Sequence, residues 1–161
     1  MKAMIIYASW FGHNRTIAHL LADTLRSRGM HVACAAAGSI NPGELTGYDL
    51  LVLGTYTHHG RASHALRDLC AQIPQRQLQK LEIALYGTQT ELFARRHPGG
   101  VDDLELCLAN RGCDLVVPPL RLRLAGTTGF QPRQVLEPDE CAQIEAFAAE
   151  LWEASVLAPL I

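Results

Sequence analysis

The sequence predicts an α/β protein, a doubly wound domain in which helices cover both faces of a parallel sheet. Short apolar runs alternate with longer segments whose apolar residues recur at helical spacing. The short runs are uninterrupted, which is typical of strands that are buried on both faces of a parallel sheet. The length of 161 residues suits one unit with a bulky core, so we expect residues 1–161 to form a single domain.

The apolar runs give five predicted strands, each bounded by residues that favour turns. Gly29 separates the first helix from the second strand, and Asn41-Pro42-Gly43 breaks the chain after that strand. The predicted strands are 4–8, 30–35, 50–54, 83–86 and a last strand in two pieces, 115–117 and 120–124, which is bent at Pro118-Pro119.

Four segments have apolar residues spaced as on one face of a helix, and each has a residue that marks its start or its end. Pro74 and Gly112 end the second and third helices, and Pro138 fits the first position of the last one. The four stripes are Ile17, Leu20, Leu21, Thr24 and Leu25; Leu66, Leu69, Cys70 and Ile73; Val101, Leu104, Cys107 and Leu108; and Cys141, Ile144, Phe147, Ala148, Leu151 and Trp152.

Composition narrows the classes of function and of location. There are 14 Lys and Arg against 16 Asp and Glu, so a net charge of −2 gives no general attraction to nucleic acid or to an anionic membrane. No apolar stretch reaches the roughly 18 residues of a membrane span. We expect no signal peptide, because His13 and Arg15 follow the first apolar run too early. The 5 cysteines form no C-x-x-C pair, so we expect a reduced, cytoplasmic protein.

Ligands of doubly wound folds bind beyond the carboxyl ends of the strands, at the point where the strand order reverses. The segments after Ala8, Gly54 and Gly87 are therefore the candidates for a site. The first of them leads into a helix N-terminus, where free N–H groups and the helix dipole favour a phosphate. It contains neither the lysine of a P-loop nor a G-x-G-x-x-G pattern. The alternative is that Ser9 and Asn14 cap only a turn and a helix.

The segment 6–18, Ile-Tyr-Ala-Ser-Trp-Phe-Gly-His-Asn-Arg-Thr-Ile-Ala, resembles the opening of flavodoxins, where a strand leads into a Ser/Thr-x-Thr-Gly-Asn-Thr phosphate loop. Ser9 and Gly12 match, whereas Phe11 replaces the second Thr of that pattern. The resemblance implies a flavodoxin-like, five-stranded sheet with strand order 2-1-3-4-5 and FMN as the cofactor. The residues implied to hold the FMN phosphate, largely through backbone N–H groups, are Ser9, Trp10, Phe11, Gly12, His13 and Asn14.

The two later segments resemble the flavodoxin loops on either side of the flavin ring. After the third strand, Gly-Thr-Tyr-Thr-His-His-Gly matches a Gly-Ser/Thr-x-Thr-aromatic pattern, with His58 in the stacking position and Gly60 able to adopt a positive φ. After the fourth strand, Phe93 has the spacing of the Tyr that covers the other face. The alternatives are a solvated histidine loop and a Phe93 that belongs to the core. The implied ring-binding residues are Thr55, Tyr56, Thr57, His58, His59, Gly60, Gly87, Thr88, Gln89 and Phe93.

The resemblance implies an electron carrier that works as a monomer between a flavodoxin reductase and an acceptor enzyme. Two alternatives stay open: a small FMN-dependent reductase that takes hydride from NAD(P)H and reduces quinones, and a binding module that has lost FMN. Arg61, Arg95 and Arg96 outnumber Glu91 in the ring-side segments, so we expect a less acidic site than in most flavodoxins, a weaker reductant, and docking that needs no basic partner. We expect no metal site, because the histidines show no H-x-x-x-H spacing.

Overall fold

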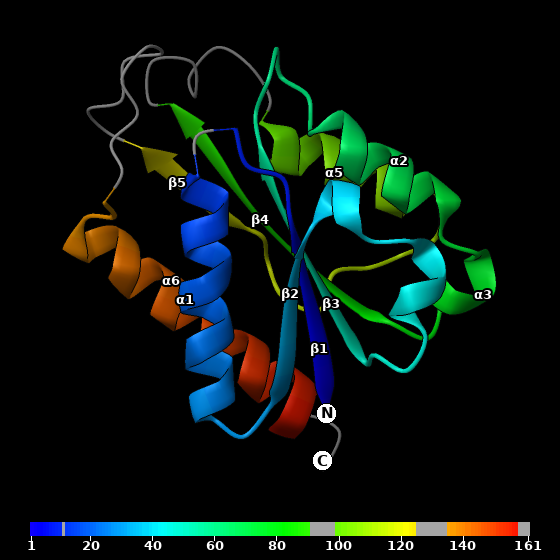
Figure 1. The fold of residues 1–161 in the computed structure, drawn as a ribbon, viewed down its shortest axis with the longest axis horizontal. Helices are drawn as coiled ribbons and strands as arrows, with labels where there is room; N and C mark the ends of the chain where they lie inside the picture. Colours follow the sequence, from blue (N-terminus) through cyan, green and yellow to red (C-terminus); the bar gives the residue numbers. More distant parts are fainter. Residues whose placement is uncertain (11, 91–98, 125–134, 158–161) are drawn as a thin grey trace.

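A computed structural model of the chain describes residues 1–10, 12–90, 99–124 and 135–157 (Figure 1). The 5-stranded sheet has the order β2-β1-β3-β4-β5, and all four neighbouring pairs are parallel. The predicted strand order is therefore confirmed. The strands are β1 (Lys2–Tyr7), β2 (His31–Ala36), β3 (Leu50–Tyr56), β4 (Glu82–Thr90) and β5 (Leu120–Leu124).

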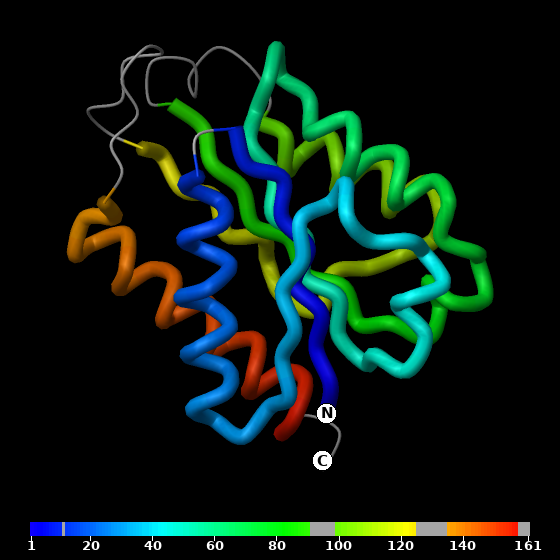
Figure 2. Tube along the Cα trace, in the orientation of Figure 1, coloured from blue at the N-terminus to red at the C-terminus, as the bar shows by residue number. Residues whose placement is uncertain are grey.

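Helices cover both faces of this sheet, as the doubly wound fold requires (Figures 1 and 2). One apolar cluster lies between the sheet and the pair α1 and α6, and a second lies between the sheet and the pair α2 and α5. The helices are α1 (His13–Ser27), α2 (His64–Gln72), α3 (Gln75–Leu78), α5 (Gly100–Ala109) and α6 (Pro138–Trp152); 3-10 turns lie at Ala37–Ser39 and Pro42–Leu45, and a π-helical turn at Glu153–Leu157. No helix in the described ranges is both long and apolar enough to cross a membrane.

The predicted last strand differs in its first half. Leu115 makes an isolated parallel bridge to Ile83, and regular pairing begins only where Leu120 meets Tyr86. The residues 115–117 are thus a bridge rather than a strand. The reason lies in Pro118-Pro119, because proline has no N–H to donate to a sheet ladder.

The predicted apolar stripe of the last helix also needs a correction. Cys141 is only partly buried, whereas its neighbour Glu140 is buried. The Glu140 carboxylate accepts a hydrogen bond from the Glu137 N–H at 2.8 Å and so caps the N-terminus of α6. A carboxylate at this position is favoured by the capping geometry. Glu140 lies in the buried stripe with Ile144 and Leu151, whereas Cys141, about 100° further round the helix, lies at the edge of that stripe, as does the half-buried Trp152.

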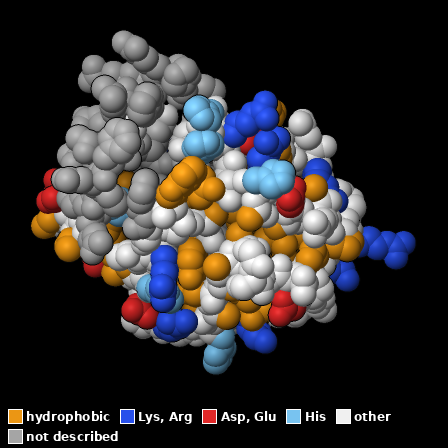
Figure 3. Space-filling model, turned by 45° about the horizontal axis from the view of Figure 1, so that its top comes forward, with side chains coloured by type: hydrophobic (Ala, Val, Ile, Leu, Met, Phe, Trp, Pro, Cys, Tyr) orange, Lys and Arg blue, Asp and Glu red, His pale blue; other side chains and the backbone are white. Residues whose placement is uncertain are grey.

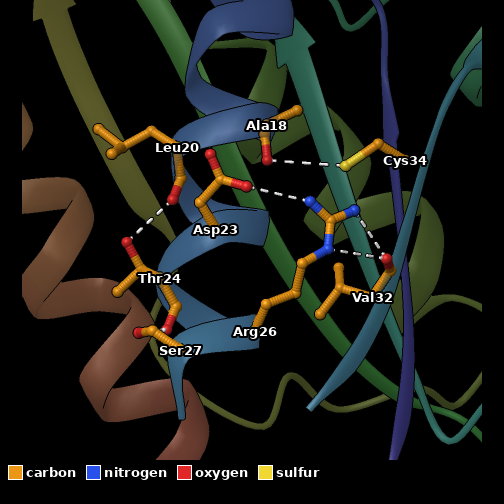
Figure 4. Close-up of polar contacts among 8 residues, drawn as sticks. All are labelled: Ala18, Leu20, Asp23, Thr24, Arg26, Ser27, Val32 and Cys34. Carbon is orange, nitrogen blue, oxygen red and sulfur yellow. Dashed lines mark hydrogen bonds and ion pairs between the residues drawn. The ribbon is translucent and has the colours of Figure 1, made fainter. Parts of the chain in front are cut away.

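The outer edge of the sheet is protected where β2 packs on α1 (Figure 4). The Arg26 guanidinium donates two hydrogen bonds, at 2.8 and 3.2 Å, to the Val32 carbonyl and pairs with Asp23 at 3.0 Å. The Cys34 thiol donates to the Ala18 carbonyl at 3.7 Å, and burial raises the pKa of this thiol. Because Arg26 occupies a carbonyl of an edge strand, that carbonyl cannot pair with another strand.

Two close approaches fix the carboxyl ends of the central strands. A Cβ atom on Gly54 would lie 1.9 Å from the Tyr86 ring, so only glycine leaves room for this ring between β3 and the first loop. The Tyr86 hydroxyl donates a 2.9 Å hydrogen bond to the Asn14 carbonyl. Burial raises the pKa of Tyr86, so the phenol keeps the proton that it donates. The central strand β4 is thereby tied to the beginning of α1.

Candidate functional site

The loop after β1, the turn after β3 and the last residues of β4, which include Gly87, lie at one end of the sheet. In the parallel register Tyr7 lies beside Gly54, and Gly54 lies beside Tyr86. The three strands therefore lie side by side with their carboxyl ends at the same edge of the sheet (Figure 2).

Hydrogen bonds from the Ala8 N–H and from the Asn14 side chain fix the beginning of the first loop. The Ala8 N–H donates to the Gly54 carbonyl at 2.8 Å, and Asn14 Nδ2 donates to the Ala8 carbonyl at 2.9 Å. Gly12 precedes α1 with a φ of 90°, a left-handed conformation that glycine adopts without strain. His13 is the first residue of α1, so the N–H groups of its first turn point towards the loop. Phe11 lies outside the described residues.

This loop leaves polar atoms without partners. Ser9 Oγ and Asn14 Oδ1 are buried, and neither has a hydrogen-bond partner in the described structure. Ser9 lines a cavity of about 470 Å³ together with Gly12, Arg15 and Ser63. A buried hydroxyl without a partner costs about 1–3 kcal/mol, so its presence calls for a ligand. A hydroxyl donor, a helix N-terminus and an arginine side by side fit a phosphate dianion.

The segment after β3 forms a two-residue turn. The N–H of His58 donates to the Arg61 carbonyl at 2.9 Å, and the N–H of Arg61 donates back to the His58 carbonyl at 3.0 Å. The two residues between them, His59 and Gly60, have φ values of 49° and 74°. The positive φ predicted for Gly60 is confirmed, and His59 shares it. A left-handed conformation costs a non-glycine residue roughly 1–2 kcal/mol, so this turn holds some strain.

The two threonine hydroxyls that precede the turn are used within the protein. Thr55 is buried; its hydroxyl donates to the Tyr56 carbonyl at 2.7 Å and accepts from the Ser63 N–H at 3.0 Å. The Thr57 hydroxyl donates to the Thr88 carbonyl at 3.1 Å and accepts from the Gly100 N–H at 2.8 Å. The two hydroxyls therefore fix the turn to β4, to the start of α2 and to the start of α5.

Trp10 lies over the same turn, a contact that the sequence patterns do not reveal. Its ring centroid is 5.5 Å from that of Tyr56, edge to face, and 5.0 Å from that of His58 at an interplanar angle of 34°. The indole nevertheless remains 58% exposed. The His58 and His59 rings contact each other at 4.2 Å. An aromatic cluster therefore joins the first loop to the second.

Near the end of β4, Gly87 is packed so closely that a larger residue would not fit. A Cβ atom on Gly87 would lie 2.1 Å from a methyl group of Val101 and 3.1 Å from the Thr55 carbonyl oxygen. Gly87 therefore allows α5 to approach the sheet. Beside it is a second cavity of about 300 Å³. Its polar lining includes Thr57, Thr88, Gln89, Asp102, Arg121 and Arg123. Phe93 lies outside the described residues, so its predicted role is untested.

A charged network that no sequence pattern indicates borders this second cavity. Arg121 on β5 pairs with Asp102 at 2.6 Å and with Glu105 at 3.3 Å, both on α5. Burial alone would raise the pKa of Asp102, but hydrogen bonds from the Arg121 guanidinium and from the Gly99 N–H hold the pKa below its usual value. Asp102 therefore stays ionised and anchors the start of α5.

The histidines near this end of the sheet lie in the turn after β3 and on α2. His64 Nε2 on α2 lies 3.1 Å from the Asp68 carboxylate. In the described ranges, no group of three or more His, Cys, Asp and Glu side chains could hold a metal ion.

Comparison with known proteins places these features in a family. The sequence model of a family described as "Flavodoxin domain" matches residues 4–99. A curated relative, "Probable flavodoxin 1" of Bacillus subtilis, is 33% identical over 128 residues, which cover 79% of this chain and 80% of the relative. The crystal structure of oxidised Flavodoxin 1 from Bacillus cereus superposes with a TM-score of 0.74 at 21% identity and covers 95% of this chain and 98% of its own. Oxidised Flavodoxin 2 from the same organism gives a TM-score of 0.70 at 25% identity, covering 95% and 99%.

Proposed function

This chain belongs to the flavodoxin family, whose members are FMN-binding electron-transfer proteins, and from this premise we propose that it carries electrons between a flavodoxin reductase and an acceptor enzyme. The proposal treats residues 1–161 as one domain that acts as a monomer. It also keeps the expected cytoplasmic location, which is supported by the 5 free cysteine thiols.

The observation that supports the proposal most directly is the buried Ser9 hydroxyl at the N-terminus of α1. It has no partner among the described residues and lines the cavity beside Gly12 and Arg15. A phosphate there would accept a hydrogen bond from Ser9 Oγ and from N–H groups of the helix, and the Arg15 guanidinium would balance its charge. We assign the phosphate of FMN to this cavity, with residues 9–14 around it.

The turn after β3 would hold one side of the flavin ring. Its backbone is fixed by the Thr55 and Thr57 hydroxyls, and the Trp10 ring contacts the His58 ring. A rigid turn loses little conformational entropy when a ring packs against it. In this proposal residues 55–60 contact one side of the ring, and Gly87, Thr88, Gln89 and Phe93 contact the other.

FMN supplies the redox chemistry when it is bound, because its ring takes up and releases electrons one or two at a time. The chain binds the phosphate, orients the ring and sets the charge around it. The Asp102 carboxylate accepts hydrogen bonds from Arg121 and from the Gly99 N–H. The Thr57 hydroxyl donates to the Thr88 carbonyl and accepts from the Gly100 N–H. The site therefore requires no side chain that acts as acid, base or nucleophile.

Reconstitution tests the proposal. We expect purified protein to bind FMN with a shifted flavin absorbance spectrum and quenched flavin fluorescence, and to pass electrons to a one-electron acceptor after chemical reduction. Rapid consumption of NADPH by the isolated holoprotein in the presence of a quinone would instead identify a reductase. Failure to bind FMN at millimolar concentration would identify a binding module and would contradict the proposal.

A further inference from the structure

The surface around the turn after β3 combines positive charge with one large exposed aromatic side chain. We call the side chains of Trp10, His58, His59 and Arg61 the docking face. Trp10 is 58% exposed, and the other three residues are exposed as well. On the face that carries the loops, Figure 3 shows histidine, Lys or Arg, and hydrophobic side chains together, with a few Asp or Glu side chains beside them. These four residues lie at the flavin edge in the proposed function, on which this inference rests.

The positive charge of the docking face is not balanced locally. Within the described ranges, two carboxylates at this end are paired with arginines, Asp103 with Arg67 and Asp102 with Arg121, and Asp68 lies 3.1 Å from the His64 imidazole. Among the described residues Arg61 has no ion-pair partner, and its backbone makes hydrogen bonds to His58. The electric field of this guanidinium therefore extends into solvent. It attracts anionic surfaces within one Debye length, which is about 10 Å at 0.1 M salt.

Six of the 16 acidic residues of the chain lie elsewhere, in helix α6 or directly beside it. Helix α6 and the residue at each of its ends carry only acidic charged side chains and no Lys or Arg. These are Glu137, Asp139, Glu140, Glu145, Glu150 and Glu153. Since α6 packs with α1 on one face of the sheet, the chain is acidic along that helix and basic at the docking face.

We propose that the docking face receives a redox protein whose contact surface is acidic, with Trp10 as the apolar anchor. Contacts with Tyr56 and His58 hold the indole in place, so little side-chain freedom is lost when a partner covers it. Tryptophan and arginine are both enriched among the residues that dominate the binding energy at interfaces. The unbalanced charge of Arg61 steers an acidic partner to the flavin edge and disfavours a basic one.

Electron-transfer kinetics of the reduced holoprotein test this charge. The probes are ferricyanide, which is anionic, and hexaammineruthenium(III), which is cationic; each ion accepts one electron, so two ions reoxidise one fully reduced FMN, whose protons pass to solvent. We expect the rate with ferricyanide to fall about tenfold as salt rises from about 10 to 300 mM, and the rate with the cation to rise. The acidic haem protein cytochrome b5 should behave like ferricyanide, and the basic cytochrome c like the cation.

Arg61→Glu is the diagnostic variant, and Arg76→Glu is its matched control. Both change the net charge by the same amount, but Arg76 lies on α3, away from the loops. Arg61→Glu should reverse the salt dependence with both probes and leave FMN content unchanged, whereas Arg76→Glu should behave as wild type. If the two variants show the same salt dependence and still bind FMN, this inference is overturned while the proposed function stands. A dimer that Arg61→Glu dissociates would also overturn it, because a second copy would then occupy the face.

Discussion

The loop after β1 and the turn after β3 lie at the same end of the sheet but treat their polar groups in opposite ways. In the loop, Ser9 Oγ and Asn14 Oδ1 are buried without partners in the described structure. Before the turn, the hydroxyls of Thr55 and Thr57 each donate one hydrogen bond and accept another. The loop therefore keeps hydrogen-bonding capacity for a ligand, whereas the turn uses its capacity to become rigid.

The two regions also differ in how much free space surrounds their backbone, and two glycine substitutions measure this difference. Gly54→Ala would place a Cβ atom 1.9 Å from the Tyr86 ring, while Gly38, which lines the cavity of the first loop, has nothing within 4 Å of its Cβ position. We expect Gly54→Ala to lower the free energy of unfolding by about 3 kcal/mol or more, because neither the ring nor the strand can move away. Gly38→Ala should change it by less than about 0.5 kcal/mol. Urea unfolding followed by circular dichroism measures both, and similar values would contradict the packing described for β3.

The hydroxyl of Thr57 tests the rigidity of the turn. Thr57→Val removes the group that accepts from the Gly100 N–H and donates to the Thr88 carbonyl. Since two part-buried backbone groups lose their partner, the free energy of unfolding should fall by about 2 kcal/mol. Thr57→Ser keeps the hydroxyl and should recover most of that loss. Equal destabilisation by the two variants would show that the methyl group, and not the hydroxyl, fixes the turn.

The Asp102 network predicts a smaller, pH-dependent effect at the start of α5. The pKa of Asp102 lies below its ordinary value of 3.8, so the folded state favours the carboxylate. This contribution is complete above the ordinary pKa and is lost as the pH falls through the lower, folded pKa. We expect wild type to lose stability below about pH 4 more steeply than Asp102→Asn does, as measured by thermal unfolding at a series of pH values. If the stability of both proteins falls with the same slope as the pH is lowered, Asp102 does not contribute in the way described.

The sequence predicts the elements well where one pattern decides them. The stripe of α1 shows this, because Ile17, Leu21 and Leu25 are fully buried. The stripe of α6 is wrong at Cys141, because the capping carboxylate of Glu140 takes the buried position instead. The Glu137-to-Glu140 spacing before an apolar run was the available signal.

Long-range contacts of the site could not be predicted in this way. Trp10 packs on His58, and Arg121 pairs with Asp102, although neither pair has a sequence spacing that indicates contact. Such pairs depend on which strands are neighbours, and that order came from the resemblance rather than from periodicity. The residues of the first loop were found because a strand leads directly into a helix N-terminus, which is a local feature.

The central claim is that the first loop binds the phosphate of FMN, and comparison of FMN with riboflavin tests it most directly. Riboflavin carries the same ring without the phosphate, so it should bind far more weakly to the wild-type protein. Ser9→Ala should weaken FMN binding about tenfold, leave riboflavin binding unchanged and not lower the stability of the protein without cofactor, because it removes a buried hydroxyl that has no partner. Equal affinities for FMN and riboflavin, or equal losses of both in Ser9→Ala, would contradict the account.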